Sequence, residues 1–453
     1  MPAPLILPLI PTPKCYSPNG RSDFGSNLTC QHQLLEFKNS RVFSPAVLIV
    51  SNGHLCRNPR VVKEANTLSL AGHAVTVLRV RNHSPSDAVD ATLLADAPFR
   101  SEAIDLLPGH GPASFGRRLA QRLWRDAAAH LGWKTIHALG PASALLARAR
   151  TVQADLTIVH NEISHWVGTH LLAQGRRVAA DIEDWHSEDL LPEHRIGRPL
   201  ELLRRIEKDL LRSCAYTSTT SEALADALHA RYGDKRPHVI TNSFPLQPNP
   251  RPSRQADSAE PSFFWFSQTL GPGRGLESFV AAWTLTKHPS KLVLLGEDRS
   301  SYRTTLCGLV PAARRSKIEF LPLVAPEKLP AEIARHDVGL ALEDRSIVSR
   351  DLTITNKILQ YLNAGLAIVA SDTAGQREVL AQSPEAGVIV DLTDPAGTAK
   401  TLDRLLADRA ALAARQAAAR RLAEDVYCWE REAPRLLALV ETALEKRPSA
   451  AVC

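Results

Sequence analysis

The stretch 356-NKILQYLNAGLAIVASDTAGQREVL-380 decides the fold of the half of the chain in which it lies. Its pattern is that of a short helix ending at Gly365, a buried strand over 366–371, and a further turn that starts at Gly375. A continuous apolar strand next to helical segments is typical of a parallel sheet that is covered on both faces. The stretch therefore predicts an α/β domain with a doubly wound sheet.

Similar runs extend outward from this stretch through both halves of the chain. In the second half they are FFWFSQ, KLVLLGE, KIEFLPL, DVGLALE and GVIVD. In the first half we predict strands at 46–52, 74–80, 156–160, 176–181, 214–219 and 238–242. Helices are expected between them, one beginning at Pro59 after an Asn58 cap and one over 221–233 with a Ser221 cap. We also predict a longer polar insertion after residue 80. Strands that alternate with helices predict two Rossmann-like domains.

The domain boundaries follow from composition. Residues 1–44 mix Pro, Ser, Asn and Gly without a period, and residues 247–262 contain four prolines. We predict a disordered N-terminal extension, an N-terminal domain, a linker, a C-terminal domain and a helix that crosses back to the N-terminal domain: 1–44, 45–246, 247–262, 263–427 and 428–447. Two such domains would place ligands in a cleft between the carboxyl ends of their sheets.

Composition narrows the class of protein and its location. The 453-residue chain has a net charge of +6 and a pI near 9.0, which favours anionic partners. Its arginines are dispersed and no aromatic-studded basic stripe occurs, so nucleic acid is disfavoured. Seven cysteines without a C-x-x-C pair indicate reduced thiols. The apolar run PLILPLI is too short to span a bilayer and lacks a basic segment before it, so we expect a cytoplasmic protein.

A glycine-rich turn opens the C-terminal domain, in FFWFSQTLGPGRGLESF. Gly271, Gly273 and Gly275 would let the backbone approach an anion at the start of a helix, where Arg274 adds a cation. A turn without a ligand is the alternative. The spacing is neither G-x-G-x-x-G nor G-x-x-x-x-G-K-[ST], so it favours neither a dinucleotide cofactor nor a P-loop nucleotide, and an oxidoreductase is disfavoured.

The stretch 356–380 resembles the N-K-x-x-E-Y-x-x-x-G-x-P-V-V-A-S-x-x-x-G-x-x-E-V segment of group 1 glycosyltransferases of the family 4 type. RNPRVVKEANTLSLAGHAVTVL, SEALADALHARYG, VITNSF, TLGPGRGLE and CWEREAPRLLALVE also resemble segments of that family, so the resemblance covers roughly 45–447. It implies the GT-B fold, in which two Rossmann-like doubly wound domains face a central cleft. It also implies sugar transfer from a nucleoside diphosphate sugar to a saccharide or lipid-linked acceptor, usually with retention, in polysaccharide or glycoconjugate biosynthesis.

The resemblance assigns donor-binding roles to eight residues of the C-terminal domain: Gly273, Arg274, Gly275, Asn356, Lys357, Gln360, Gly375 and Glu378. The chain departs from the family pattern at three positions. Gln360 stands where the family has a ribose-binding Glu, and Gln268 stands where many relatives have Arg. Leu352 stands where the family usually has an earlier acidic residue. A neutral hydrogen bond in place of a charged one should cost on the order of 1 kcal/mol of donor affinity.

The missing positive charge could come from Lys357, or from Arg345 and Arg350 in the preceding loop. No Asp-x-Asp sequence occurs, so we expect no metal site and no cofactor besides the donor substrate. Side chains and helix dipoles would then neutralise the leaving diphosphate.

Two residues that follow the predicted strand 156–160 are candidates for catalysis. His160 lies where the family has a His-rich turn, and Glu162 follows it closely. From the resemblance we predict His160 near the reacting carbon, although a histidine that caps a strand end is the alternative.

The acceptor side is predicted from two further loops of the N-terminal domain. Asp184 and His186, in DIEDWHSED, could bind sugar hydroxyls or form an acid–base pair, and a solvated loop is the alternative. Gly53 and Arg57 belong to a loop that should face the same cleft.

One helix suggests a membrane contact. Residues 115–133 form a basic segment with Leu119, Leu123 and Trp124 near one face, which would suit an anionic membrane surface or packing on its own domain. Two other functions stay open at this point. The chain could be a nucleotide-sugar epimerase, or a degenerate GT-B protein that binds a nucleotide sugar or a partner without transfer.

Overall fold

The computed structural model describes residues 44–233, 235–248, 260–298 and 301–445. Apart from Ser44, the predicted N-terminal extension lies outside these residues, as do most of the predicted linker and the last two residues of the predicted C-terminal helix. Apart from Ser44, the described residues form one compact unit.

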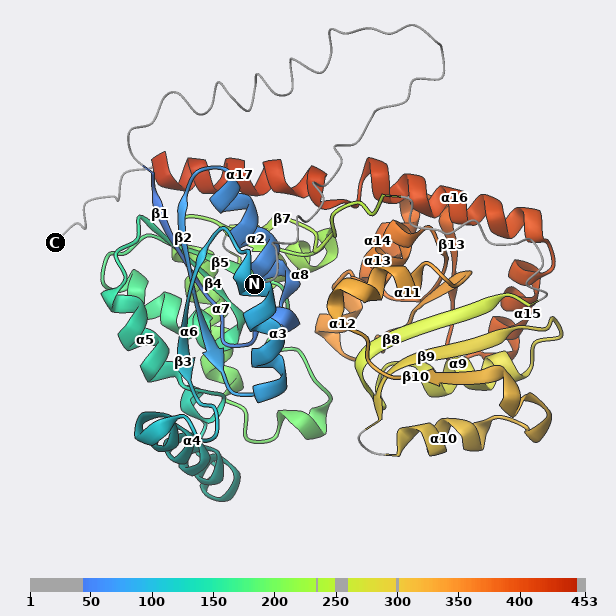
Figure 1. The fold of residues 1–453 in the computed structure, drawn as a ribbon, viewed down its shortest axis with the longest axis horizontal. Helices are drawn as coiled ribbons and strands as arrows, with labels where there is room; N and C mark the ends of the chain where they lie inside the picture. Colours follow the sequence, from blue (N-terminus) through green and yellow to red (C-terminus); the bar gives the residue numbers. More distant parts are fainter. Residues whose placement is uncertain (1–43, 234, 249–259, 299–300, 446–453) are drawn as a thin grey trace, which may run out of the picture. The chain divides into compact units, whose positions relative to one another are not determined.

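The N-terminal sheet has seven parallel strands in the order β3-β2-β1-β4-β5-β6-β7 (Figure 1). The strands are β1 (Ala46–Val50), β2 (Ala74–Arg81), β3 (Arg100–Asp105), β4 (Leu156–His160), β5 (Val178–Ile182), β6 (Thr217–Thr219) and β7 (His238–Val239). The helices of this half are α2 (Pro59–Leu70), α3 (Ser84–Ala95), α4 (Gly111–Leu131), α5 (Ala142–Thr151), α6 (Asn161–Leu172), α7 (Leu200–Ser213) and α8 (Glu222–Tyr232).

The C-terminal sheet has six parallel strands in the order β10-β9-β8-β11-β12-β13. They are β8 (Ser262–Leu270), β9 (Lys291–Asp298), β10 (Ile318–Leu321), β11 (Val338–Ala341), β12 (Ala367–Ser371) and β13 (Gly387–Val390). The helices are α9 (Leu276–Thr284), α10 (Tyr302–Leu309), α11 (Leu329–Ile333), α12 (Val348–Leu352), α13 (Asn356–Ala364), α14 (Ala374–Ala381), α15 (Pro395–Leu406) and α16 (Arg409–Asp425). The strand order reverses between β8 and β11, and ligands of such sheets bind outside the carboxyl ends at this point.

The predicted strands of both sheets are confirmed, and so is the doubly wound fold class. Local chemistry explains the helix starts: the Asn58 side chain accepts a hydrogen bond from the Val61 amide, and Ser221 accepts one from Leu224. Strands β4 and β12 are buried along their whole length because helices cover both faces of each sheet, which is why they are nearly continuous apolar runs.

The prediction of a polar insertion after residue 80 is wrong. The segment between β2 and β4 contains α3, β3, α4 and α5. Strand β3, with the sequence RSEAID, is an edge strand that pairs only with β2, and most of its residues remain partly exposed. An edge strand of this kind lacks the apolar run that identifies the central strands.

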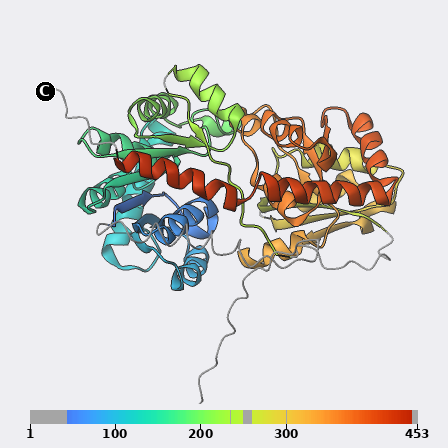
Figure 2. The same cartoon turned by 90° about the horizontal axis from the view of Figure 1, so that it is seen from above.

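The last two helices pack on different sheets (Figure 2). In α17 (Trp429–Glu445), Trp429, Leu436 and Val440 share a hydrophobic cluster with Ile49 and Val61 of the N-terminal half. The indole nitrogen of Trp429 also donates a hydrogen bond to Thr67 Oγ1 at 2.9 Å. Helix α16 packs on the C-terminal sheet, where Ala419 and Leu422 share a cluster with residues of β12 and α13. The chain therefore returns to its N-terminal half after completing the second sheet.

Candidate active site

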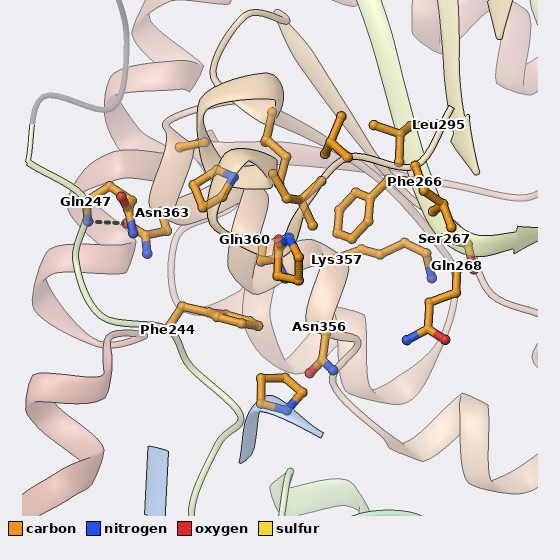
Figure 3. A pocket seen from close by; sticks show the side chains of 18 of the residues that line it. Phe244, Gln247, Phe266, Ser267, Gln268, Leu295, Asn356, Lys357, Gln360 and Asn363 are labelled. Carbon is orange, nitrogen blue, oxygen red and sulfur yellow. Dashed lines mark hydrogen bonds between the residues drawn. The ribbon is translucent and has the colours of Figure 1, made fainter. Parts of the chain in front are cut away.

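A pocket of about 450 Å³ lies at the carboxyl end of the C-terminal sheet (Figure 3). Its walls are largely apolar: Phe244, Phe266, Leu295, Leu323, Val324, Pro326, Leu329, Pro330 and Ile333. The N-terminal half contributes Cys56, Arg57 and Pro59 to the same lining. We call it the apolar pocket. Its size and lining suit one ring system of a ligand such as a nucleoside.

The polar groups of the apolar pocket are mostly neutral amides. In Figure 3, Asn356, Lys357 and Gln360 come from α13, and Gln268 follows Phe266 and Ser267 at the end of β8. The pairing of β8 with β9 is irregular between Phe266 and Thr269, so the backbone turns where Gln268 lies. Within the described chain, the side chains of Asn356, Gln268 and Gln360 make no hydrogen bond to the protein. They are thus available to donate to or accept from a ligand, and the lining contains no carboxylate.

Lys357 extends from the apolar pocket to a buried carboxylate. Its ammonium nitrogen lies 2.8 Å from Glu343 Oε1, and the Arg274 Nη1 atom lies 3.4 Å from the same oxygen. Burial lowers the pKa of Lys357, and Glu343 offsets this only in part. Burial raises the pKa of the Glu343 carboxyl, but Lys357 and Arg274 hold it below its ordinary value. Glu343 is therefore an anion between two cations.

The glycine-rich turn lies on the other side of this ion cluster. Gly273 and Gly275 have φ of +77° and +71°, and a side chain at Gly275 would lie 2.5 Å from Leu392. The Arg350 guanidinium donates to the Gly273 carbonyl at 2.7 Å, which holds the turn against α12. These constraints explain why glycine is needed where the turn precedes α9.

A second, polar pocket of about 250 Å³ adjoins the turn and includes Gly273, Gly275, Glu343, Asp344 and Ser371 in its lining. Because Lys357 lines the apolar pocket and Glu343 lines the polar one, the two pockets meet at the Lys357–Glu343 ion pair. Six of the eight predicted donor residues, Gly273, Arg274, Gly275, Asn356, Lys357 and Gln360, are therefore brought together at this junction.

The other two predicted donor residues lie in neither pocket. A Cβ atom at Gly375 would lie 2.4 Å from the Thr353 carbonyl oxygen, so this glycine permits close packing of α14 on the loop before α13. The Glu378 carboxylate accepts hydrogen bonds from the amides of Glu222 and Ala223, at 3.0 and 3.1 Å. Glu378 thus caps helix α8 of the N-terminal half. Burial raises the pKa of Glu378.

The structure corrects the position expected for His160. Its side chain is 1% exposed, and its Nε2 atom lies 2.5 Å from Glu64 Oε2, while Nδ1 lies 3.1 Å from Asp181 Oδ2. Although burial lowers the pKa of His160, the carboxylates of Glu64 and Asp181 raise it to about 10. The same Asp181 forms a bidentate pair with Arg60, at 2.6 and 2.7 Å. His160 is therefore a member of a closed, buried ion network and lines neither pocket.

The predicted catalytic residue Glu162 meets His186, which was predicted for the acceptor side. The His186 Nδ1 atom lies 3.1 Å from Glu162 Oε2, and Arg198 donates to the other Glu162 oxygen at 3.3 Å. Burial raises the pKa of Glu162, but His186 and Arg198 hold it below its ordinary value. Asp184 is exposed in the loop that follows β5, and Trp185 next to it donates its amide to Ser349 of α12 at 3.0 Å. This loop therefore contacts the C-terminal half directly.

The two residues predicted from the first loop differ in position. Arg57 lines the apolar pocket and hydrogen-bonds His83 through Nη2. Gly53 lines neither pocket, and a Cβ atom there would meet open space.

Among the described residues, His54, Asp87 and Asp90 form the one group whose ligand-type atoms lie close enough for a metal ion. Arg79 lies 2.9 Å from Asp90, and Arg81 forms a bidentate pair with Asp87. Both carboxylates already have cationic partners, so the residues present do not favour a metal here.

Two residues of the site were missed by the sequence reasoning. Glu343 is the last residue of the predicted strand DVGLALE and follows β11 in the structure, and a carboxylate at the carboxyl end of a parallel strand could have been singled out by that position alone. Glu64 lies on the inner face of α2, and only the tertiary structure brings it to His160, 96 residues away.

Comparisons with known proteins agree with this architecture. Residues 260–408 match the family model described as Glycosyl transferases group 1. The chain is similar to HepE from Anabaena in complex with UDP, with a TM-score of 0.63 and 15% identity over 88% of this chain and 100% of the HepE chain. It is also similar to sucrose-phosphate synthase from Thermosynechococcus elongatus, with a TM-score of 0.64 and 17% identity over 88% of this chain and 98% of that chain.

A third solved structure is WaaG, described as a glycosyltransferase involved in lipopolysaccharide biosynthesis. Its TM-score is 0.54, with 14% identity over 86% of this chain and 99% of WaaG. Comparison with curated protein sequences gives no match. At these identities the structural likeness shows the fold, which is GT-B. The resemblance to group 1 is confirmed by the family match, whereas assignment to family 4 within that group stays a prediction.

Proposed function

Over residues 260–408 the chain belongs to the glycosyl transferases group 1, and from this premise we propose that it moves a sugar from a nucleoside diphosphate sugar to a saccharide or lipid-linked acceptor. The observation that carries the proposal is the junction of the two pockets. A nucleoside fits the apolar pocket, and Lys357, Arg274 and the amino end of α9 then lie where a diphosphate would follow. HepE, whose fold is similar, has been solved with UDP and with UDP-glucose.

The leaving diphosphate can be stabilised by this chain's own groups. Two cations and a helix amino end supply positive charge without a metal ion, so we propose that transfer is metal-independent. We further propose retention at the anomeric carbon and a role in polysaccharide or glycoconjugate biosynthesis, as the resemblance implies. Activity in EDTA and the anomeric configuration of the product, read by proton NMR, test the first two statements.

Gln360 is the departure from the family pattern that bears most directly on donor binding, and so on the choice between an enzyme and a degenerate binding protein. We expect Gln360→Glu to raise affinity for the nucleotide sugar several-fold, because a carboxylate forms stronger hydrogen bonds to ribose hydroxyls than a neutral amide does, by about 1 kcal/mol. The measurement is a thermal-shift and calorimetric titration with UDP, GDP, ADP and TDP sugars. Gln153→Glu is the control, since this residue is exposed and lines neither pocket.

The titration also discriminates between the proposed functions. Stabilisation of the wild type by one nucleotide sugar, at 100 times its dissociation constant, should reach about 2.7 kcal/mol. Sugar transfer to added saccharides then identifies the transferase, whereas interconversion of the free donor would identify an epimerase. If no nucleotide sugar stabilises either protein, the transferase proposal fails and a partner-binding protein replaces it.

Helix α4 supports a membrane-associated acceptor. Phe115, Leu119 and Leu123 follow one another at four-residue intervals and are 59%, 47% and 61% exposed. The buried residues of this helix, Ser114 and Ala128, lie on its opposite side. Trp133, just beyond the helix, is 53% exposed. The apolar stripe therefore points away from the domain that carries it.

The charges beside the stripe favour an anionic surface. Arg118, Arg122 and Arg125 flank it along one side of the helix. In the described part of the chain, no helix has the length and apolar character needed to cross a bilayer. We therefore propose that α4 lies in the interface of an anionic membrane, at the cytoplasmic face where a lipid-linked acceptor would be presented.

We expect a triple variant, Phe115→Ser with Leu119→Ser and Leu123→Ser, to lose binding to anionic vesicles by about tenfold or more, because three apolar side chains no longer enter the interface. Co-sedimentation with phosphatidylcholine vesicles containing about one-third phosphatidylglycerol measures this. Leu70→Ser is the matched control, because Leu70 is 77% exposed on α2. Equal binding to neutral vesicles, or self-association through α4 in sedimentation analysis, would contradict the membrane proposal.

A further inference from the structure

Glu343 occupies an unusual position for a site that receives a diphosphate. Its Oε1 atom contacts both Lys357 and Arg274, and its side chain is 4% exposed. Its Oε2 atom has no hydrogen-bond partner within the described residues, although the carboxylate lines the polar pocket. The Glu343 amide donates to Ser371 Oγ at 2.9 Å, which fixes this residue at the end of β11. A fixed anion therefore lies among the cations assigned to the donor.

The carboxylate changes what the cluster can bind. These three groups carry a net charge of about +1, where Arg274 and Lys357 alone would supply +2. The polar pocket beside them is also lined by Arg345 and by the carboxylates of Glu277, Asp344, Asp372 and Asp391. Charges a few ångströms apart interact strongly in a partly buried site, so each further negative charge on a ligand is opposed by Glu343 as well as attracted by the cations. The cluster should thus be sensitive to the number of charges on its ligand.

Substrate and product differ in that number. In a nucleoside diphosphate sugar both phosphates are esterified, and each carries one negative charge. Transfer breaks the bond between the anomeric carbon and the diphosphate, and the terminal phosphate of the product gains a second ionisation with a pKa of about 6. At neutral pH the product therefore carries about one charge more than the donor, at the end that faces the cluster.

We propose that Glu343 is a specificity-determining residue that disfavours the free nucleoside diphosphate relative to the nucleotide sugar, and so promotes release of the product. This inference rests on the proposed function, because it places the diphosphate at Lys357 and Arg274. A carboxylate that only held Lys357 in place would affect both ligands equally. Discrimination between the two ligands is therefore its distinguishing property.

The test is calorimetric titration of the wild type and Glu343→Gln with matched pairs: UDP and UDP-glucose, GDP and GDP-mannose, ADP and ADP-glucose, TDP and TDP-glucose. Gln keeps the shape and removes the charge. For the pair that binds, we expect the diphosphate to gain about tenfold in affinity and the nucleotide sugar distinctly less, so that the ratio of dissociation constants shifts by about fivefold. In an activity assay the same variant should show stronger inhibition by added diphosphate.

Two further variants make the result decisive. Asp425→Asn removes a carboxylate from an exposed position on α16 that lines neither pocket, and it should leave the ratio unchanged. Glu343→Asp keeps the charge but withdraws it, and its ratio should lie between those of the wild type and Glu343→Gln. It serves as the test if Glu343→Gln does not fold.

The outcomes separate this inference from the function on which it rests. Binding of one pair with an unchanged ratio in Glu343→Gln, or with equal loss for both ligands, overturns the role of Glu343 and leaves the donor site intact. Failure of every pair to bind the wild type overturns the proposed function and this inference with it.

Discussion

Lys357→Met should lower affinity for the nucleotide sugar by about 2–5 kcal/mol, roughly thirtyfold or more, which is the usual cost of truncating one member of a buried charged pair in a binding site. The Lys357 ammonium is nearly buried and lies 2.8 Å from Glu343. Without it the diphosphate loses a cation and meets an unopposed Glu343 carboxylate. Calorimetric titration with the nucleotide sugar identified above measures the loss.

Controls separate this effect from unfolding. Lys400 is an exposed residue of α15, and Lys400→Met should leave donor affinity unchanged. The double variant Lys357→Met with Glu343→Gln removes the unpaired buried charge, so its thermal stability should recover while its donor affinity stays low. Full donor affinity in a folded Lys357→Met variant would contradict the position given to the diphosphate.

Asp181→Ala should destabilise the N-terminal half by about 3–5 kcal/mol, because it leaves the Arg60 guanidinium buried without its partner. Asp181 accepts two hydrogen bonds from Arg60 and one from Ser218, at 2.6, 2.7 and 2.7 Å, and it is 1% exposed. Burial opposes ionisation, but Arg60 and His160 hold the pKa of Asp181 well below its ordinary range. Urea unfolding at neutral pH measures the change in the free energy of unfolding.

The matched control is an exposed pair of the same chemistry. Arg236 Nε lies 2.7 Å from Asp226 Oδ1, and the Asp226 side chain is 70% exposed. Asp226→Ala should cost no more than about 1 kcal/mol, since solvent screens a surface pair. No loss in Asp181→Ala would show that the buried network contributes little to stability. An equal loss in Asp226→Ala would show that burial does not explain the size of the effect.

The two halves of the chain arrange their charged residues differently. The N-terminal half closes its charged residues into a buried network around Asp181, so His160 is held in place and is shielded from solvent. The C-terminal half leaves Lys357 and Arg274 next to pockets, with neutral amides beside them. This difference supports the proposal that the donor binds to the C-terminal half, which contains the family match over 260–408.

The sequence by itself determined most strands of the two sheets and six residues that line or adjoin the two pockets. Buried parallel strands are apolar along their whole length, and this is why the runs around 46–52 and 366–371 identified β1 and β12. Asn356, Lys357 and Gln360 were named from the family resemblance, and they lie together because one turn of a helix brings neighbours in sequence to one place. The turn before α9 was found from its glycines, which would let the backbone approach an anion, and the structure gives two of them a positive φ.

Only the tertiary structure decided which charges pair with one another. Glu343, which follows β11, pairs with Lys357 of α13. Glu64 contacts His160, 96 positions away, and Glu378 caps a helix that begins 156 positions earlier. No periodicity records such contacts, because each depends on where the ends of separate strands and helices meet. That packing determines whether a titratable side chain lines a pocket or forms a buried ion pair. The sequence pattern around the residue is the same in both cases.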